Sequence, residues 1–186
     1  MERYMVHLKN EKYAPKDSRM LVYKARDLCS DMHASVRVAR VASDFVEFDV
    51  GVEAEDLDAL IGRLNPIGSL LNARHIIEED ISKEEGIKDG IFYFNNERFW
   101  ECHEAFEGVW NKCFGREKDL VQGIILVAVA FAHGQKNDQS IGIGMLSRAL
   151  EKLGNSPAAY NGINIDNIRK KSKSMQESEI LSRFEI

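Results

Sequence analysis

A histidine and two glutamates lie close together in the second half of the chain, in a segment whose spacing predicts one helix. His103, Glu104 and Glu107 stand between two tryptophans, Trp100 and Trp110. A helix places residues i and i+4 on one side, about 6 Å apart along the axis, so His103 and Glu107 should converge. An imidazole and a carboxylate so placed can bind one metal ion, or act as a base and the group that orients it.

The same spacing also has a purely structural interpretation. A His-Glu pair one turn apart can be no more than a hydrogen bond on a helix surface, or can cap a neighbouring helix. The pattern HExxE lacks the second histidine of the HExxH zinc proteases. We therefore take His103, Glu104 and Glu107 as catalytic candidates, with His103 and Glu107 as candidate ligands of a divalent metal, and keep the structural alternative.

The helix that follows supplies candidate partners. Residues 122–134 are apolar on nearly every side, which predicts a central helix. The connection near Gly115 is short, so the two helices should pack antiparallel. Gln122 should then lie near Glu107, and His133 near Trp100. Gln122, Trp100, Trp110 and His133 are the predicted binding residues. Structural alternatives are an amide that satisfies a buried carboxylate, and a histidine at a helix end with Gly134 as its C-cap.

A stripe of apolar residues must hold the candidate site in place. Five residues at helix spacing predict a buried face beside the His-Glu face: Phe99, Cys102, Phe106, Val109 and Cys113. Gly108 stands inside this helix and weakens it by about 1 kcal/mol relative to alanine. We expect Gly108 to make room for a close neighbour.

The first half of the chain has a different periodicity. Apolar residues alternate over 46–52, which predicts a strand paired with residues near 36–38 across a turn at Ser43-Asp44. Residues 5–8 predict an earlier strand, and 70–77 a last one. Helix spacing covers 21–32 and 57–64, the latter stopped by Asn65-Pro66. The order β-α-β-β-α-β is that of the ferredoxin-like arrangement.

The fold class is therefore α+β, with a ferredoxin-like domain over residues 1–80 and an all-α helical bundle over 81–186. The acidic stretch 78–80 is typical of a linker or the start of a helix. A further helix over 143–153 ends at 154–157, and a basic helix capped by Asp166 follows. The run 169–173 of that helix indicates a solvated face or, alternatively, a patch for anionic partners.

Composition limits the function classes. The chain has 186 residues and a net charge of −5, which argues against a nucleic-acid partner. The N-terminal residues lack the apolar core of a signal peptide, and no apolar run is long enough to span a bilayer. Three cysteines form neither a disulfide framework nor a CxxC pair. We expect a cytoplasmic protein without a membrane partner, and a homo-oligomer stays open.

The second half resembles a known family. Phe94-Asn95, Phe99-Trp100, the run from His103 to Trp110, and Gln122-Gly123 together resemble the family called domain of unknown function 309, over roughly residues 88–170. A Gly-Ile-x-Ile element at Gly162 is also similar. The resemblance implies a helical bundle, and members are commonly labelled predicted metal-dependent hydrolases. By analogy it favours a functional His103-Glu107 face.

Two functions fit these observations. One is a metal-dependent hydrolase in which Glu104 and Gln122 support His103 and Glu107. The other is a non-catalytic binding or scaffold protein, in which His103, Glu107 and Gln122 form a buried structural network. Whether the protein is an enzyme, and which substrate and metal it takes, is left open by the sequence.

Overall fold

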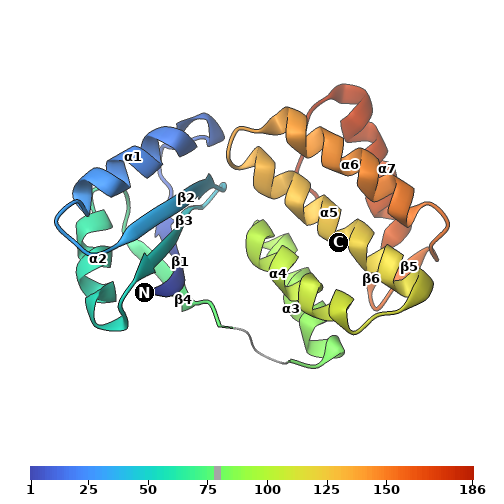
Figure 1. The fold of residues 1–186 in the computed structure, drawn as a ribbon. Coiled ribbons are helices and arrows are strands. Elements are labelled where there is room, and N and C mark those ends of the chain that lie inside the picture. Colours follow the sequence, from blue (N-terminus) through green and yellow to red (C-terminus); the bar gives the residue numbers. More distant parts are fainter. Residues whose placement is uncertain (78–80) are drawn as a thin grey trace. The chain divides into compact units, whose positions relative to one another are not determined.

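The computed structural model describes residues 1–77 and 81–186, so the predicted linker at 78–80 lies outside the described residues. The chain divides into two compact units, one comprising residues 1–79 with 135–137 and the other the remaining residues. Figure 1 shows strands and two helices in the first unit and a group of helices in the second. The α+β fold class is confirmed.

The first unit is a four-stranded sheet with two helices. Its elements follow the predicted order: β1 (Glu2–Lys9), α1 (Ser18–Leu28), β2 (Ser35–Val41), β3 (Phe45–Val52), α2 (Leu57–Leu64) and β4 (Leu70–His75), with short 3-10 turns before each helix. The strand order is β2-β3-β1-β4, and neighbouring strands are antiparallel. The hairpin at Ser43-Asp44 is closed by a hydrogen bond from the amide of Ala42 to the carbonyl of Phe45, 2.9 Å long.

The pleat of the sheet separates an apolar face from a polar one. The core of this unit joins alternate strand residues to the helices: Tyr4, Val6 and Leu8 of β1, Val46, Phe48 and Val50 of β3, Leu21 and Ala25 of α1, and Leu60 and Leu64 of α2. Residues between them point to the other face, because successive side chains of a strand alternate. Helix α1 ends at Leu28, one turn earlier than the spacing up to Met32 predicted.

The second unit is built from five helices and one short hairpin. Its elements are α3 (Lys83–Asn95), α4 (Phe99–Asn111), α5 (Gly115–Gly134), α6 (Gln139–Leu153), β5 (Ala159–Tyr160), β6 (Ile163–Asn164) and α7 (Ile165–Ser178). The hairpin β5–β6 was not predicted, because two-residue strands have no periodicity to detect. The N-cap of α7 is Asn164, whose side chain accepts a hydrogen bond from the amide of Asn167, so the predicted Asp166 cap is wrong.

Helices α4 and α5 pack antiparallel, as predicted. Near the turn, the amine of Lys118 lies 3.8 Å from the ring centre of Trp110. At the opposite end, Phe99 stacks on Phe131 with ring centroids 4.9 Å apart. The turn ends at Gly115, whose φ of +56° is a left-handed conformation that suits glycine. Helix α5 is central, with buried residues along its length from Leu120 to Ala132.

A carboxylate in the first turn of α5 ties three elements of the second unit together. Glu117 Oε1 accepts hydrogen bonds from the amine of Lys83 at the start of α3 and from the hydroxyl of Tyr160 in β5, the latter 2.9 Å long. The Lys83 contact lowers the pKa of Glu117, and burial together with this carboxylate raises the pKa of Tyr160. These bonds fix the hairpin on the helices.

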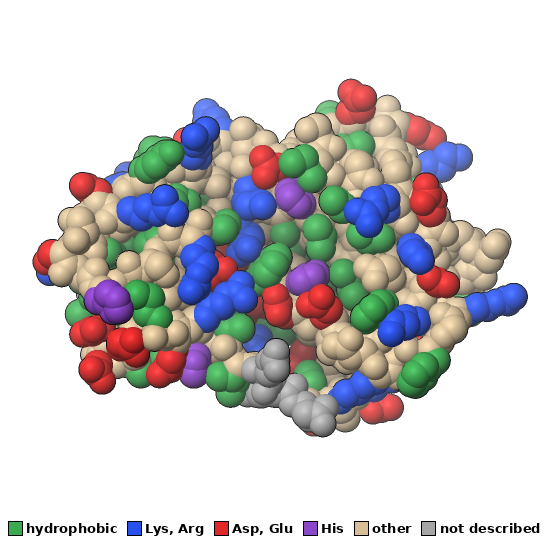
Figure 2. All heavy atoms as spheres, viewed as in Figure 1, with side chains coloured by type: hydrophobic (Ala, Val, Ile, Leu, Met, Phe, Trp, Pro, Cys, Tyr) green, Lys and Arg blue, Asp and Glu red, His purple; other side chains and the backbone are tan. Residues whose placement is uncertain are grey.

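Charges are mixed over the surface, and no membrane-spanning helix is found. Acidic and basic side chains are interspersed over the face drawn in Figure 2. Among the described residues, no helix has both the length and the apolar character needed to cross a bilayer, and this includes α5. The exposed residues of the basic run, Lys170, Lys171 and Lys173, lie on one helix with buried Ile168 and Ser172.

Candidate functional site

The apolar stripe of α4 fixes how the helix presents its polar face. The five predicted core residues, Phe99, Cys102, Phe106, Val109 and Cys113, are at most 4% exposed. At the N-terminal end, the guanidinium of Arg98 binds both carboxylate oxygens of Glu101, which is itself buried. With one side of α4 held in the core and its first turn held by this pair, the adjoining face carrying His103 keeps a defined direction.

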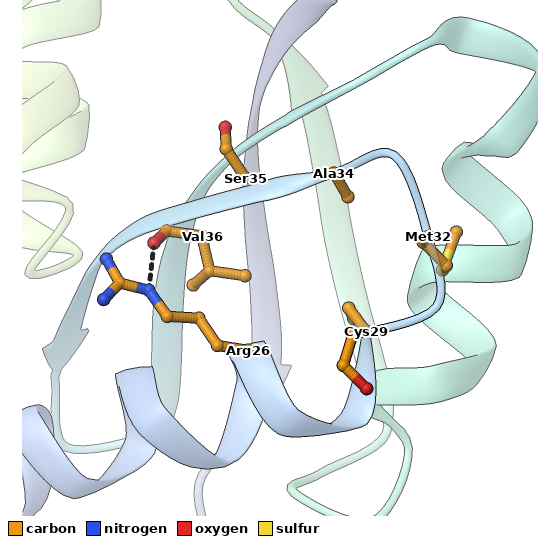
Figure 3. A pocket seen from close by; sticks show the side chains of 7 residues that line it. Arg26, Cys29, Met32, Ala34, Ser35 and Val36 are labelled. Atoms are coloured by element: carbon orange, nitrogen blue, oxygen red, sulfur yellow. Dashed lines mark hydrogen bonds between the residues drawn. The ribbon is translucent and has the colours of Figure 1, made fainter.

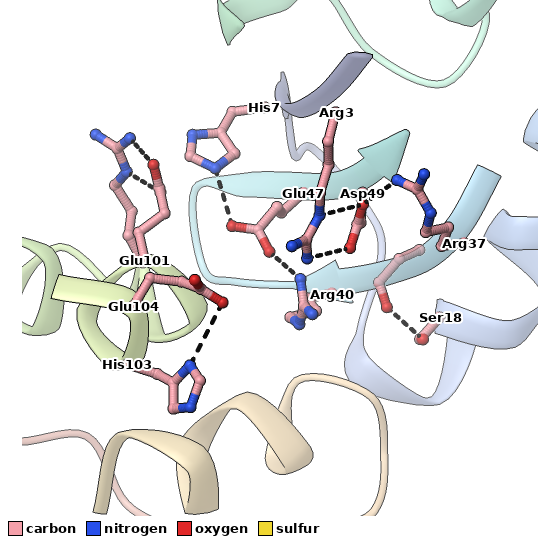
Figure 4. A network of polar contacts seen from close by, with 12 residues as sticks. Arg3, His7, Ser18, Arg37, Arg40, Glu47, Asp49, Glu101, His103 and Glu104 are labelled. Carbon is pink, nitrogen blue, oxygen red and sulfur yellow. Dashed lines mark hydrogen bonds and ion pairs between the residues drawn. The ribbon is translucent and has the colours of Figure 1, made fainter. Parts of the chain in front are cut away.

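His103, Glu104 and Glu107 form a compact group of possible ligands. One ligand atom from each residue can be chosen so that all three lie within 4.8 Å of one another. Nδ1 of His103 lies 3.6 Å from Glu104 Oε1, and Nε2 lies 3.9 Å from Glu107 Oε2. Figure 4 shows Glu104 and the His103 ring turned toward each other. The convergence expected from helix spacing is therefore present, and Glu104 takes part in it.

The contacts of the His103 ring leave its nitrogens free to bind. Both distances to carboxylates exceed the length of a hydrogen bond, about 2.7–3.2 Å. Nδ1 is buried and has no hydrogen-bond partner among the described residues. The ring lies against Trp100, with centroids 4.8 Å apart and planes 30° apart. Trp100 thus holds the imidazole on one side, while its nitrogens face two carboxylates at distances that leave room for a bridging atom.

Exposure increases across the group. The side chain of His103 is 16% exposed, that of Glu104 38% and that of Glu107 53%. In a buried structural network the carboxylates would be shielded from water. Each would also be paired, because an unpaired buried charge is costly. The exposure of Glu107 therefore disagrees with the network interpretation and leaves access for water and a small ligand.

The other predicted binding residues occupy three different environments. Gln122 is half-buried on α5, and within the described part of the chain no hydrogen bond joins it to His103 or Glu107. Trp110 packs partly against the core with the amine of Lys118 over its ring. His133 lies in the last turn of α5, where Nδ1 is 3.5 Å from Asp138 Oδ2. Of the predicted binding residues, Trp100 is in contact with His103, through the packing of their rings.

The two glycine predictions differ from the structure. A Cβ on Gly108 would meet no described atom within 4 Å, so the expected close neighbour is absent there. Gly134 is the last residue of α5 and is not among the residues with positive φ, so it is not a left-handed C-cap. A Cβ added at this position would come within 2.8 Å of Leu181 Cδ1, so close packing favours glycine there.

The group offers a chemically suitable set of metal ligands. Imidazole nitrogen and carboxylate oxygen suit divalent ions such as Zn²⁺ and Mn²⁺. Three protein ligands with a remaining open position are the usual set of a catalytic site, since the open position takes water or substrate. An ion held by these three side chains would lower the pKa of a bound water and so supply a nucleophile near neutral pH. Unbound, His103 and Glu107 could still act as a base and its orienting group.

The sequence interpretation missed a polar network on the face of the first unit's sheet opposite α1 and α2 (Figure 4). Glu47 of β3 accepts a hydrogen bond from Arg40 and lies 3.0 Å from Nε2 of His7. Asp49, two residues on, binds Arg3 through two hydrogen bonds and Arg37 through one, 2.8–3.1 Å long. The alternation over 46–52 predicts only that Glu47 and Asp49 share the polar face of that strand.

Pairing controls the charge of Glu47. Burial by itself raises the pKa of this carboxyl, but the hydrogen bond with His7 and the charge of Arg40 outweigh burial, so the pKa of Glu47 lies below its ordinary value. The available signal was the pair Glu47 and Asp49, two apart on β3, with Arg3 and His7 four apart on β1. Only the strand register, which pairs His7 with Glu47 and Arg40 with Glu47, brings them together.

A pocket of about 270 Å³ lies in the first unit, where the end of α1 meets β2 (Figure 3). It is lined by Arg26, Cys29, Ser30, Met32, Ala34, Ser35 and Val36. The Arg26 Nε donates a 2.9 Å hydrogen bond to the carbonyl of Val36. Burial raises the pKa of the Cys29 thiol, which keeps it protonated and poorly nucleophilic. The pocket therefore offers no activated nucleophile.

Comparison with known proteins places the candidate site within a region of recognised similarity. Residues 87–145 match the family described as Domain of unknown function (DUF309). A curated protein from Aquifex aeolicus (strain VF5), named "Uncharacterized protein", is 31% identical over 91 residues, which are 48% of this chain and 27% of that protein. The chain thus spans little more than a quarter of this relative's length. Neither name states a reaction.

The matched residues contain α4 whole, and with it His103, Glu104 and Glu107. Gln122 and His133 of α5 also fall inside the match, while the strands and helices of the first unit, β1 to β4 with α1 and α2, lie outside it. The predicted resemblance is therefore confirmed, over residues 87–145, to the family described as Domain of unknown function (DUF309).

Proposed function

We propose that the second unit binds a divalent metal ion through His103, Glu104 and Glu107 and is a metal-dependent hydrolase. The observation that carries this proposal is the spacing of His103 from its two carboxylates, 3.6 Å and 3.9 Å, which brings three ligand atoms together without hydrogen bonds between them. A bound ion would fill that space and use interactions that the three side chains do not make with one another.

Each residue has a role in this proposal. His103, held against the Trp100 ring, supplies the nitrogen ligand. Glu104 supplies a carboxylate oxygen beside it. Glu107, the most exposed of the three, either completes the ligand set or takes a proton from the attacking water. The ion, when bound, would lower the pKa of its water and stabilise negative charge on the substrate. Gln122 and His133 have supporting roles at most.

Several further expectations belong to the same proposal. The boundary near residue 80 is supported by two cores that share no residues. The ferredoxin-like identification of the first unit is supported by its strand order. A cytoplasmic location is supported by three free cysteines. No nucleic-acid partner is proposed, and a homo-oligomer stays open.

Hydrolysis is tested with a panel of chromogenic carboxylic and phosphate esters, each assayed with Zn²⁺, Mn²⁺ or Mg²⁺ added. We expect turnover that depends on the added metal and falls by about 100-fold or more in His103→Ala and Glu107→Gln. His75→Ala is the matched control, because His75 also pairs with a glutamate, Glu2 at 3.1 Å, but outside this group. Equal turnover in wild type and His103→Ala would overturn the proposed hydrolase.

A further inference from the structure

A short segment near the end of the described chain crosses the second unit without forming a helix or strand. This segment, Leu181–Ile186, is called the tail segment below. It contacts residues of α3, α5, α6 and α7 and the turn between α3 and α4, and these contacts do not form a strand ladder. Four groups of contacts each match a different property of the tail segment: its main chain, its charge and two of its apolar side chains.

The side chain of Asn95 contacts the main chain of the tail segment. Its Oδ1 accepts a hydrogen bond from the amide of Ile186 at 3.0 Å, and its Nδ2 donates to the Ile186 carbonyl at 3.5 Å. A carboxamide that offers one acceptor and one donor to the same residue imitates a neighbouring strand. Asn95 therefore recognises main-chain groups of the tail segment, whatever side chain residue 186 carries.

A second contact recognises charge. Nη1 of Arg183 lies 2.8 Å from Glu97 Oε1, and Nη2 donates a 3.1 Å hydrogen bond to the carbonyl of Asn95. Glu97 has a φ of +59°, a left-handed conformation that non-glycine residues seldom adopt, and its side chain is only 11% exposed. The strained backbone and low exposure of Glu97 indicate that its ion pair with Arg183 is a specific contact and not a chance pairing on the surface.

Two apolar contacts recognise shape. The ring of Phe184 is 8% exposed and lies among aromatic rings, with centroids 5.3 Å from Phe94 and 5.8 Å from Phe131. Leu181 occupies space that two glycines leave open, since its Cδ1 lies 2.8 Å and 2.9 Å from the positions of a Cβ on Gly134 and Gly142. Any larger residue at either position would displace the leucine.

We propose that these residues of α3, α5, α6 and the α3–α4 turn form a selective peptide-binding site. Its ligand class is a peptide segment with the pattern apolar-x-basic-aromatic-x-apolar, and its resident ligand is the tail segment of this chain. Asn95 binds the ligand backbone, Glu97 its basic residue, the Phe94–Phe131 pocket its aromatic residue, and Gly134 with Gly142 its first apolar residue. The site is distinct from His103, Glu104 and Glu107.

The tether explains why the resident ligand keeps the site filled. Segment 181–186 follows the end of α7 at Ser178 after two residues, so its effective concentration at the site is in the mM range expected for a short linker. A free peptide of the same sequence can therefore compete only when the internal contact is weakened. The Arg183 side chain is 53% exposed, so Arg183→Ala should weaken the internal contact mildly. Phe184 is buried, so Phe184→Ala should weaken it strongly.

The test uses the full chain and a fluorescent peptide, Leu-Ser-Arg-Phe-Glu-Ile, blocked at both ends. Fluorescence anisotropy should show saturable one-to-one binding to Phe184→Ala and to Arg183→Ala, at least about 10-fold tighter than binding to wild type. Adding Asn95→Ala to either variant should weaken binding by about 10-fold, whereas adding the matched control Asn111→Ala, an exposed asparagine at the end of α4, should not.

Circular dichroism checks that each variant retains its helices, and Arg183→Ala serves if Phe184→Ala does not fold. A peptide with the same residues in scrambled order should bind at least about 10-fold more weakly. Three results would overturn the proposal: no binding to a folded tail variant, equal binding of the scrambled peptide, or binding indifferent to Asn95→Ala.

Discussion

At the scale of single residues, local spacing predicted which candidate ligands lie together but not which residue of the next helix faces them. His103, Glu104 and Glu107 lie on one helix, so helix geometry alone brought them together. The predicted partnership with Gln122 depended on how two helices rotate against each other, which no local pattern determines. Glu107 instead lies near His103 and half in water, and so needs no buried amide.

The buried carboxylate Glu47 shows the same limit of prediction. Its partners His7 and Arg40 stand 40 and 7 residues away in the sequence. Alternation predicted that Glu47 and Asp49 share one face of the strand, but only the register of β1, β2 and β3 shows that this face carries their arginine and histidine partners.

We predict that Glu47→Gln lowers the free energy of unfolding by about 3 kcal/mol, because it removes a buried carboxylate charge that pairs with both Arg40 and His7. Urea denaturation near neutral pH measures the change. Asp31→Asn is the matched control, because the Asp31–Arg63 pair is exposed and its loss should change stability far less. Equal effects of the two substitutions would contradict the assigned role of Glu47.

The pKa of Glu47 adds a pH dependence to this prediction. It is lowered in the folded state relative to its ordinary 4.5, so the unfolded chain takes up the proton first as pH falls. The stabilisation from ionised Glu47 is therefore present above that ordinary value and is lost as pH falls through the lower folded value. Wild type and Glu47→Gln should converge in stability in acid; a gap that stays constant from neutral to acidic pH would refute this.

At the scale of elements, a regular repeat of apolar residues was enough to predict a helix or strand. Segments without such a repeat could not be predicted. The spacing of Leu57 to Leu64 and the stop at Asn65 gave α2 with its observed ends. The stripe on α4 gave a core face that is buried throughout. Hairpin β5–β6 and the tail segment have no repeat, and their positions depend on contacts such as Tyr160 with Glu117 that a single sequence does not reveal.

Glycines inside helices provide a matched test of packing. A Cβ on Gly123 of α5 would lie 2.6 Å from Leu153 Cγ and 3.3 Å from the carbonyl of Ala149, both in α6. Gly123→Ala should therefore cost about 1–3 kcal/mol of stability through overpacking. Gly144 of α6 is exposed with no described atom within 4 Å of an added Cβ, so Gly144→Ala should stabilise by up to about 1 kcal/mol.

Thermal and urea denaturation of both glycine variants measure these effects. The opposite signs are the essential result, since the same substitution is made in neighbouring helices. If Gly123→Ala were as stable as Gly144→Ala, α5 and α6 would not approach as closely as the contact with Leu153 indicates.

At the scale of the whole molecule, the chain has two separate cores. Buried residues of the first core lie between positions 4 and 67, and those of the second between 87 and 184. The change from strand alternation to helix spacing along the sequence predicted this division into a mixed and a helical part. The sequence could not state what the first unit contributes to function, because its polar sheet face appears only when the strands are paired.

Separate cores predict local effects of core substitutions. Phe48→Ala removes a fully buried ring from the first unit and Phe106→Ala removes one from the second. Each should cost about 3–5 kcal/mol. Hydrogen exchange followed by mass spectrometry should show faster exchange in β1 to β4 for Phe48→Ala and in α3 to α6 for Phe106→Ala. Equal acceleration in both units by either variant would contradict separate cores.

The central claim is that His103, Glu104 and Glu107 bind one divalent metal ion. Isothermal titration of the full chain with Zn²⁺ and with Mn²⁺ tests it most directly. We predict one site for the preferred ion, an affinity at least about 10-fold lower in His103→Ala and in Glu107→Gln, and an unchanged affinity in His75→Ala. No saturable binding of either ion, or the same affinity in His103→Ala as in wild type, would contradict the claim.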